Sequence, residues 1–264
     1  MGVHLFNTEE LKSQIRSGAT GYLEADPFPH TVITDFLRPD QVCALAAEFP
    51  PDVSSYERHA LHSQSNKYAM RDWGAFGPRT REFIAEMHSE PVLSVLSEMT
   101  GLHDLLPDPY FEGGGQHFSG PGGRLGVHAD FNVHPRLAIL RVINVLVYLN
   151  ETWKEEWGGN LELWNEDMTE LRKSVVPLGG TAVIFSCSET SFHGLPDPIT
   201  CPEGTGRKSI ALYYYQVKHQ LPTSHSTLYK DRPDGDSHPK SVHGTAESRV
   251  GRLLRKASFR KDAN

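Results

Sequence analysis

Apolar residues in the first third of the chain recur mostly at the spacing of amphipathic helices. Three helices are predicted, each bounded or interrupted by Pro or Gly: residues 8–18, a segment from Pro39 to Pro50, and residues 80–99 with an interruption near Pro91. The alternating segment HTVITDF, which follows Pro29, predicts a strand. Residues 51–77 are polar, and we expect them to form a long loop.

From Leu105 onward the pattern changes to short runs rich in Val, Ile, Leu and Tyr, separated by glycine pairs. The runs are RLGVHADF, AILRVINVLVYLN, NLELW, KSVVPL, TAVIFS and RKSIALYYYQ. Short strands separated by glycine turns indicate an antiparallel sandwich or barrel rather than alternating strands and helices. The predicted fold class is therefore mostly β with packed helices, a double-stranded β-helix (jelly roll) core buttressed by N-terminal helices.

The 264 residues are enough for one sizeable core, and we expect a single domain over residues 1–264. Residues 1–104 form its mainly helical N-terminal support, 105–217 its jelly-roll core and 218–264 a polar tail. The tail ends in a basic segment between Arg249 and Lys261, which we expect to be a solvated helix packed on the body. Docking of an acidic substrate or partner is the alternative for this segment.

Composition narrows the class of protein. The net charge of −7 argues against nucleic-acid binding, and no apolar run of about 18 residues predicts a membrane span. The N-terminal sequence has no basic and apolar regions of a secretory signal. The three cysteines, Cys43, Cys187 and Cys201, are odd in number and far apart, which favours reduced thiols and a cytoplasmic location.

Two histidines and a carboxylate form a candidate metal site. His128 and Asp130 alternate on a predicted strand, so both side chains point to one face, and a jelly roll lets His193 approach from the opposite sheet. Two His and one carboxylate bind one face of a non-haem Fe(II) and leave the other face open. The triplet has alternatives, because a chain with 14 His contains on the order of one His-x-Asp by chance. His128 can be a core histidine, and His193 can be a loop histidine.

Arg207 starts the last strong predicted strand. An arginine that points into a barrel needs a partner, and a dicarboxylate ligand supplies one. Ser209 faces the same way, and Tyr148 lies on an inner strand from which it can bond the same carboxylate. A surface position after the Gly204–Gly206 turn is the alternative for Arg207.

Seven segments in order carry a family resemblance: GGGQH, GGRLGVHADFN, RVINVLVYLNETW, GGNLELW, VVPLGGTAVIF, SFHGLP and RKSIALYYY. Together they resemble the Fe(II)/2-oxoglutarate-dependent dioxygenases in their prolyl 4-hydroxylase-like branch, over roughly residues 105–217. PFPHTVITDFL resembles the lead-in strand of that branch. The resemblance implies one catalytic domain in which His128, Asp130 and His193 bind iron.

The same resemblance implies a cosubstrate site. Arg207 would pair with the far carboxylate of 2-oxoglutarate, joined by Tyr148, and Ser209 fits the Arg-x-Ser form found elsewhere in the superfamily.

One position departs from the family pattern. Ten residues before the first iron ligand, where prolyl hydroxylases often have a cosubstrate-binding tyrosine, this chain has Phe118. Gln116, His117 or Asn132 are the candidate replacements, and Asn132 is included in the expected cosubstrate site.

The implied activity is hydroxylation of an unactivated C–H bond, with a prolyl or other amino-acid residue as the expected target. The implied cofactors are Fe(II), 2-oxoglutarate as cosubstrate and O₂, with ascorbate as a reductant; the products include succinate and CO₂. Asp130 favours hydroxylation, because halogenating relatives have a small non-coordinating residue there. The expected partner is a protein, peptide or small-molecule substrate, and no nucleic acid or membrane.

Three other functions stay open. The first is a hydroxylase of a free amino acid or a small natural product. The second is a non-catalytic cupin-like protein that binds metal as a sensor. The third is a zinc hydrolase, which needs a general base in place of the cosubstrate arginine.

Overall fold

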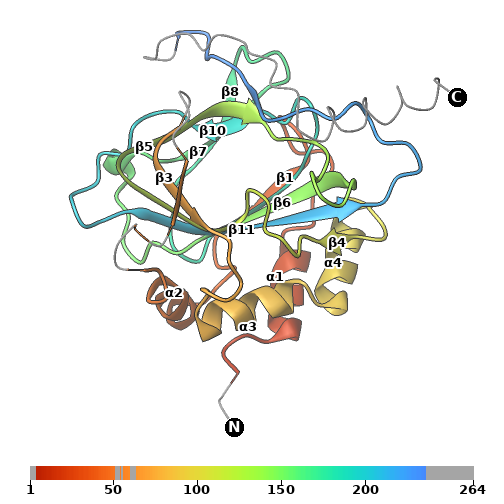
Figure 1. Cartoon of the computed structure of the whole chain (residues 1–264), viewed down its shortest axis with the longest axis horizontal. Coiled ribbons are helices and arrows are strands. Elements are labelled where there is room, and N and C mark those ends of the chain that lie inside the picture. The colour runs from red at the N-terminus through yellow and green to blue at the C-terminus, as the bar shows by residue number, and fades with distance from the viewer. Residues whose placement is uncertain (1–3, 51–53, 55, 60–63, 236–264) are drawn as a thin grey trace, which may run out of the picture.

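A computed structural model describes residues 4–50, 54, 56–59 and 64–235. Its strands form a nearly closed antiparallel barrel, and four helices pack below one wall of the barrel (Figure 1). This is the jelly-roll architecture with helical support that the strand pattern predicts. Within the described residues, no helix is both long and apolar enough to cross a membrane.

The helices begin and end at residues with local reasons to do so. They are α1 (Thr8–Ser17), α2 (Pro39–Ala46), α3 (Pro78–Met87) and α4 (Glu90–Thr100). The side chain of Asn7 caps α1, and proline occupies the first turn of each of the other three, where no backbone N–H is needed. The predicted helix over 80–99 is therefore two helices, with Pro91 in the first turn of the second.

The described residues contain twelve strands, which follow the predicted order of β segments with additions. They are β1 (His30–Ile33), β2 (Glu57–His59), β3 (Gln64–Met70), β4 (Leu106–Pro107), β5 (Gly115–Ala129), β6 (Leu140–Tyr148), β7 (Leu161–Trp164), β8 (Leu171–Val175), β9 (Ala182–Ser186), β10 (His193–Leu195), β11 (Arg207–Gln216) and β12 (Leu228–Tyr229). A short 3₁₀ helix spans Glu155–Trp157.

The long strand β5 connects the two walls of the barrel. Its first half pairs with β11 and its second half with β10 and β12, while β3 pairs with both halves. The change of partners coincides with Gly122, whose φ of 74° suits glycine, and Gly123, where a Cβ would lie 2.7 Å from the carbonyl oxygen of Gly120. The glycine pair therefore lets one strand serve both walls.

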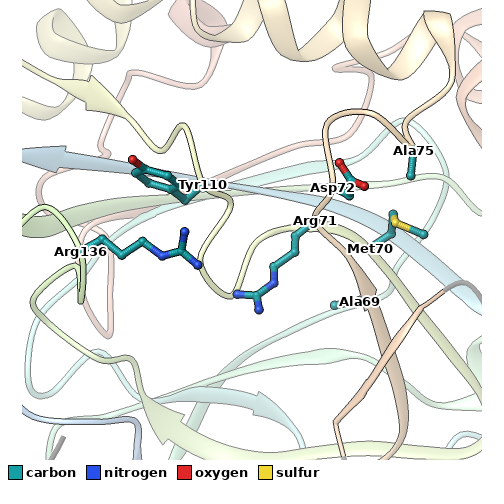
Figure 2. A pocket seen from close by; sticks show the side chains of 7 residues that line it. All are labelled: Ala69, Met70, Arg71, Asp72, Ala75, Tyr110 and Arg136. Carbon is teal, nitrogen blue, oxygen red and sulfur yellow. The ribbon is translucent and has the colours of Figure 1, made fainter. Parts of the chain in front are cut away.

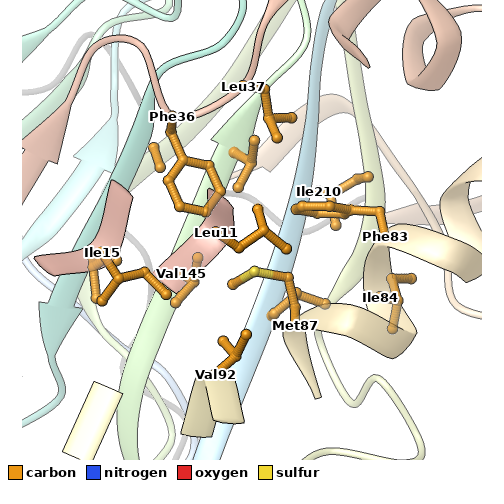
Figure 3. Packing of buried hydrophobic residues seen from close by; sticks show 14 of the residues in the cluster. Leu11, Ile15, Phe36, Leu37, Phe83, Ile84, Met87, Val92, Val145 and Ile210 are labelled. Atoms are coloured by element: carbon orange, nitrogen blue, oxygen red, sulfur yellow. The ribbon is translucent and has the colours of Figure 1, made fainter. Parts of the chain in front are cut away.

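Alternation along β6 and β11 separates the helix-covered face from the barrel interior. Val145 and Ile210 pack against Leu11 of α1 and Phe83 of α3 in the largest apolar cluster (Figure 3). The intervening residues of the same strands, including Tyr148 and Arg207, point the other way, because strand side chains alternate between faces. The helices thus support one wall of the interior.

The expectation of a long loop over residues 51–77 is wrong. β2 and β3 form a hairpin there, and β3 pairs with β5. The segment QSNKYAM has no clear apolar alternation, because one of its faces meets the polar interior of the barrel. Hydrophobic patterning cannot find such a strand.

The polar tail contains a short strand as far as it is described. In β12, Tyr229 pairs with His128 and Leu228 with Ala129 of β5, and the N–H of Lys230 donates to the carbonyl of Val127 at 2.9 Å. The tail therefore extends the second wall of the barrel. The basic segment after Arg249 lies outside the described residues.

Candidate metal centre

Three side chains converge inside the barrel. His128 belongs to β5, Asp130 follows directly after that strand, and His193 opens β10, where it pairs in register with His128. One oxygen of Asp130 lies 3.6 Å from Nε2 of His128, and the other lies 3.4 Å from Nε2 of His193. One ligand atom of each residue lies within 4.8 Å of the others, a spacing that fits a single metal ion.

Backbone contacts orient both imidazole rings. Nδ1 of His128 donates to the carbonyl of Gly126 at 2.8 Å, and Nδ1 of His193 donates to that of Ser191 at 2.9 Å. With the proton on Nδ1, Nε2 presents a lone pair toward Asp130. Burial lowers the pKa of His193 to about 4, so its ring is neutral at pH 7. Neutral imidazole is the form that binds a metal.

The carboxylate of Asp130 is held by two neighbours outside the triplet. Arg141 Nη2 lies 3.0 Å from Oδ2, and the amide of Asn144 donates to the same oxygen at 2.7 Å. Burial opposes ionisation, but Arg141, His193 and His128 together outweigh it and keep the pKa of Asp130 well below its usual range. Asp130 is therefore an anion at neutral pH.

Arg141 is fixed in turn. Its guanidinium lies 3.5 Å from the ring centroid of Tyr213 and 4.8 Å from that of Phe131, and it donates to Oδ1 of Asn144. Asn144 thus receives bonds from Arg141 and gives one to Asp130, so it sets the position of both charged groups.

Asn144→Ala is expected to weaken metal binding about 10- to 100-fold, the usual effect of losing a hydrogen-bond partner of a metal ligand. Isothermal titration with Mn²⁺ would measure it. Asn160→Ala, which removes a half-buried asparagine bonded to Ser174, is the matched control. Unchanged affinity in the Asn144 variant would mean that Arg141 alone orients the carboxylate.

A buried cation and a buried hydroxyl lie together on the next strands. Arg207 is 5% exposed, donates through Nε to the carbonyl of Gly159 at 2.9 Å and lies 4.7 Å above the ring of Tyr148. Among the residues that the structure describes, no carboxylate pairs with Arg207, and the buried hydroxyl of Tyr148 has the guanidinium of Arg207 beside it but no acceptor for its own proton. Such groups are costly to bury unless a ligand satisfies them, so the pair fits an anion.

The other expected cosubstrate residues differ in position. Ser209 is buried and stands directly opposite Tyr148 in the register of β11 and β6. The side chain of Asn132 bonds the tail instead: its amide donates to the carbonyl of Thr223 at 2.9 Å and accepts from the N–H of His225 at 3.0 Å. Its side chain therefore fastens the tail, and its placement does not support the expected role in the cosubstrate site.

The candidate replacements for the missing tyrosine on β5 lie on different faces of that strand. Gln116 donates to Thr80 of α3, and Phe118 packs on the helix-covered face, so both point away from the interior. His117 lies on the interior face, opposite Ser209. The structure adds a fourth candidate donor to the inner carboxylate, Lys67 of β3. The sequence analysis missed it because β3 is too polar to be recognised as a strand.

A pocket of about 440 Å³ opens where β3 ends. Figure 2 shows Arg71 and Arg136 extending toward each other across it, with Tyr110 beside them. Glu112 lies 3.1 Å from Arg71 and 3.9 Å from Arg136, and Arg136 also stacks 4.8 Å from the ring of Tyr110. Ala69 and Met70, on opposite faces of β3, both line the pocket, which therefore lies at the end of this strand.

Comparison with known proteins identifies the class. Residues 114–215 match the family model described as the 2OG-Fe(II) oxygenase superfamily. This segment contains the candidate metal ligands, Tyr148 and Arg207. This segment of the chain is similar to that superfamily, and the relatives below are named prolyl hydroxylases. Members use Fe(II), 2-oxoglutarate and O₂, and the His-Asp-His group fits the metal.

Individual relatives are more distant. The chain is 25% identical over 200 residues to the mouse protein named prolyl 3-hydroxylase OGFOD1, which covers 73% of this chain and 34% of that one. The chain thus spans about a third of the length of this curated relative.

Solved structures share the fold. A prolyl-4-hydroxylase from Pseudomonas putida matches with a TM-score of 0.54 and 22% identity, over 79% of this chain and 99% of that one. A Trichoplax adhaerens prolyl hydroxylase, in complex with a peptide of a hypoxia inducible factor, matches with a TM-score of 0.53 and 18% identity, over 80% of this chain and 94% of that one. These likenesses confirm the predicted double-stranded β-helix.

Proposed function

We propose that this protein is an Fe(II)- and 2-oxoglutarate-dependent dioxygenase that hydroxylates an unactivated C–H bond of a prolyl or other amino-acid residue, releasing succinate and CO₂. The observation that carries the proposal is the buried guanidinium of Arg207, without a carboxylate partner among the described residues, beside the buried hydroxyl of Tyr148, which has no acceptor among them. A metal-binding scaffold or a zinc hydrolase has no need of this cationic site.

The residues present fit the cofactors. His128, Asp130 and His193 would hold Fe(II), and Arg207 with Tyr148 would bind the far carboxylate of 2-oxoglutarate, with Ser209 beside them. Bound Fe(II) supplies the activation of O₂, driven by oxidation of the 2-oxo acid. The protein orients these groups, keeps Asp130 ionised with the help of Arg141 and keeps His193 neutral.

The pocket between Arg71, Arg136 and Tyr110 supports a substrate that enters at the end of β3. Two arginines and an exposed tyrosine suit a peptide segment with polar or acidic groups. The mouse relative is named a prolyl hydroxylase, and the Trichoplax protein is described with a bound peptide. A volume of about 440 Å³ also falls in the range of small-molecule sites, which keeps a free amino acid or small natural product as the second candidate.

The test is incubation with Fe(II), ascorbate and 2-oxoglutarate, followed by succinate measurement and mass spectrometry. Proline-containing peptides and free amino acids would be supplied in parallel, and omission of Fe(II) is the control. We expect iron-dependent succinate and one added oxygen on a peptide. Metal binding without succinate under any substrate would favour a sensor, and hydrolysis with Zn²⁺ would favour the hydrolase.

We further propose that residues 1–264 act as one catalytic domain. The packing of the helices on the barrel wall and the pairing of the tail with β5 support it. The cytoplasmic location remains a prediction from the cysteine pattern.

A further inference from the structure

Lys67 points into the barrel. Its neighbours on β3, Tyr68 and Met70, pack on the helix-covered side with the main apolar cluster. Because strand side chains alternate, Lys67 and Ala69 occupy the opposite face.

The strand register places Lys67 in one row with Arg207. Lys67 pairs with Ser119 of β5, and Ser119 pairs on its other side with Arg207 of β11. Residues directly opposite in neighbouring strands project from the same face of the sheet. Two cations therefore flank β5 on the interior face, and Tyr148 lies beyond β11, on the side away from Lys67.

The charges that act on Lys67 are those of the site. Burial lowers the pKa of Lys67 to about 8; Asp130 raises it, and Arg207 and Arg141 lower it further. The amine is thus still mostly protonated at pH 7. Among the residues that the structure describes, no hydrogen bond or ion pair engages its ammonium group, although a half-buried cation gains from a partner.

We propose that Lys67 binds the carboxylate of 2-oxoglutarate that chelates the metal, an inference that rests on the proposed function. In the proposed function Arg207 and Tyr148, on the other side of β5, bind the far carboxylate. The chelating carboxylate must lie beside the metal ligands, and Asp130 is the ligand whose charge reaches Lys67.

Charge and geometry both support this assignment. Arg141 is neutralised by Asp130, which leaves Arg207 and Lys67 as two cations for the two carboxylates of the cosubstrate. Phe118, at the position where the family often has a tyrosine, faces the helices, so a donor from the neighbouring strand β3 takes over its task.

Two 2-oxo acids distinguish the binding of the chelating carboxylate from the binding of the far carboxylate. 2-Oxoglutarate has both, whereas 2-oxobutyrate has the chelating carboxylate and keto group but no far carboxylate. Each would be titrated under anaerobic conditions into the Fe(II)-loaded full chain, and the visible charge-transfer absorption of the chelate would report binding without turnover. The variants are Lys67→Met, Lys67→Arg and Arg207→Met. Lys208→Met removes a lysine from the opposite face of the same sheet, where its ammonium bonds the carbonyl of Ala46, and serves as the control.

Lys67→Met is expected to weaken the binding of both acids by about 10- to 100-fold, the effect of one charge-assisted bond. Arg207→Met should weaken 2-oxoglutarate only, and Lys67→Arg should stay within a few-fold of the wild type. If Lys67→Met weakens 2-oxoglutarate alone, Lys67 serves the far carboxylate and the proposal is wrong. If it weakens neither, Lys67 is not a cosubstrate residue.

Thermal unfolding of each metal-free variant controls for misfolding, and Lys67→Gln replaces Lys67→Met if the latter fails to fold. A wild-type protein that gives no chelate absorption with 2-oxoglutarate would overturn the proposed function as well. Wild-type binding together with an unaffected Lys67→Met overturns the role of Lys67 alone.

Discussion

Replacing Asp130 by alanine is expected to lower succinate formation by more than about a hundredfold, since even the outer partners of a metal ligand contribute about 10- to 100-fold. The variant keeps two histidines and loses the anionic ligand, so metal affinity should fall with activity. Succinate formation and metal content after dialysis would be measured together. Wild-type turnover in this variant would show that the metal lies elsewhere.

The same substitution should also destabilise the protein. Arg141 is 2% exposed and would lose its carboxylate partner, and breaking a buried ion pair on one side costs roughly 3–5 kcal/mol. Denaturant unfolding of the metal-free protein would measure this effect. Asp130→Asn, which keeps the side-chain shape, separates loss of charge from loss of packing. An Asp130→Ala protein as stable as the wild type would mean that Arg141 finds another partner.

Replacing Arg207 by methionine is expected to raise the KM for 2-oxoglutarate by about 10- to 100-fold and to change kcat much less. The substitution removes the charge-assisted pair with the far carboxylate and leaves the metal ligands in place. Tyr148→Phe is the matched comparison: it removes one neutral hydrogen bond and should raise KM by about two- to tenfold. A loss of kcat at unchanged KM would contradict a cosubstrate role for Arg207.

Stability separates this role from a structural one. Arg207 is buried without a carboxylate partner among the described residues. The substitution Arg207→Met therefore leaves no buried carboxylate without its partner. The metal-free variant should be as stable as the wild type or more stable, in contrast to Asp130→Ala. A strongly destabilised Arg207→Met protein would indicate that its bond to Gly159 is structural.

The sequence predicts those parts of the fold whose signal is local. Apolar alternation in β6 and β11 is plain because one face of each packs on helices, and His128 and Asp130 share a face by strand period alone. β3 was missed because its inward position Lys67 is charged. Arg141 and Asn144 were missed because their role depends on a contact with Asp130, which only the folded chain reveals. Asn132 was misplaced for the same reason, since its partners are about 90 residues away, in the tail.

The short strand β12 has a consequence for where the working protein ends. The family match stops at residue 215, whereas Tyr229 pairs with the metal-ligand position His128, their rings 5.5 Å apart. A fragment that ends at residue 215 would keep every candidate metal ligand and yet lose a hydrogen-bonded neighbour of the strand that carries His128. An end drawn by homology would thus remove part of the support of the metal centre, and a truncated protein that binds iron poorly would say little about the full chain.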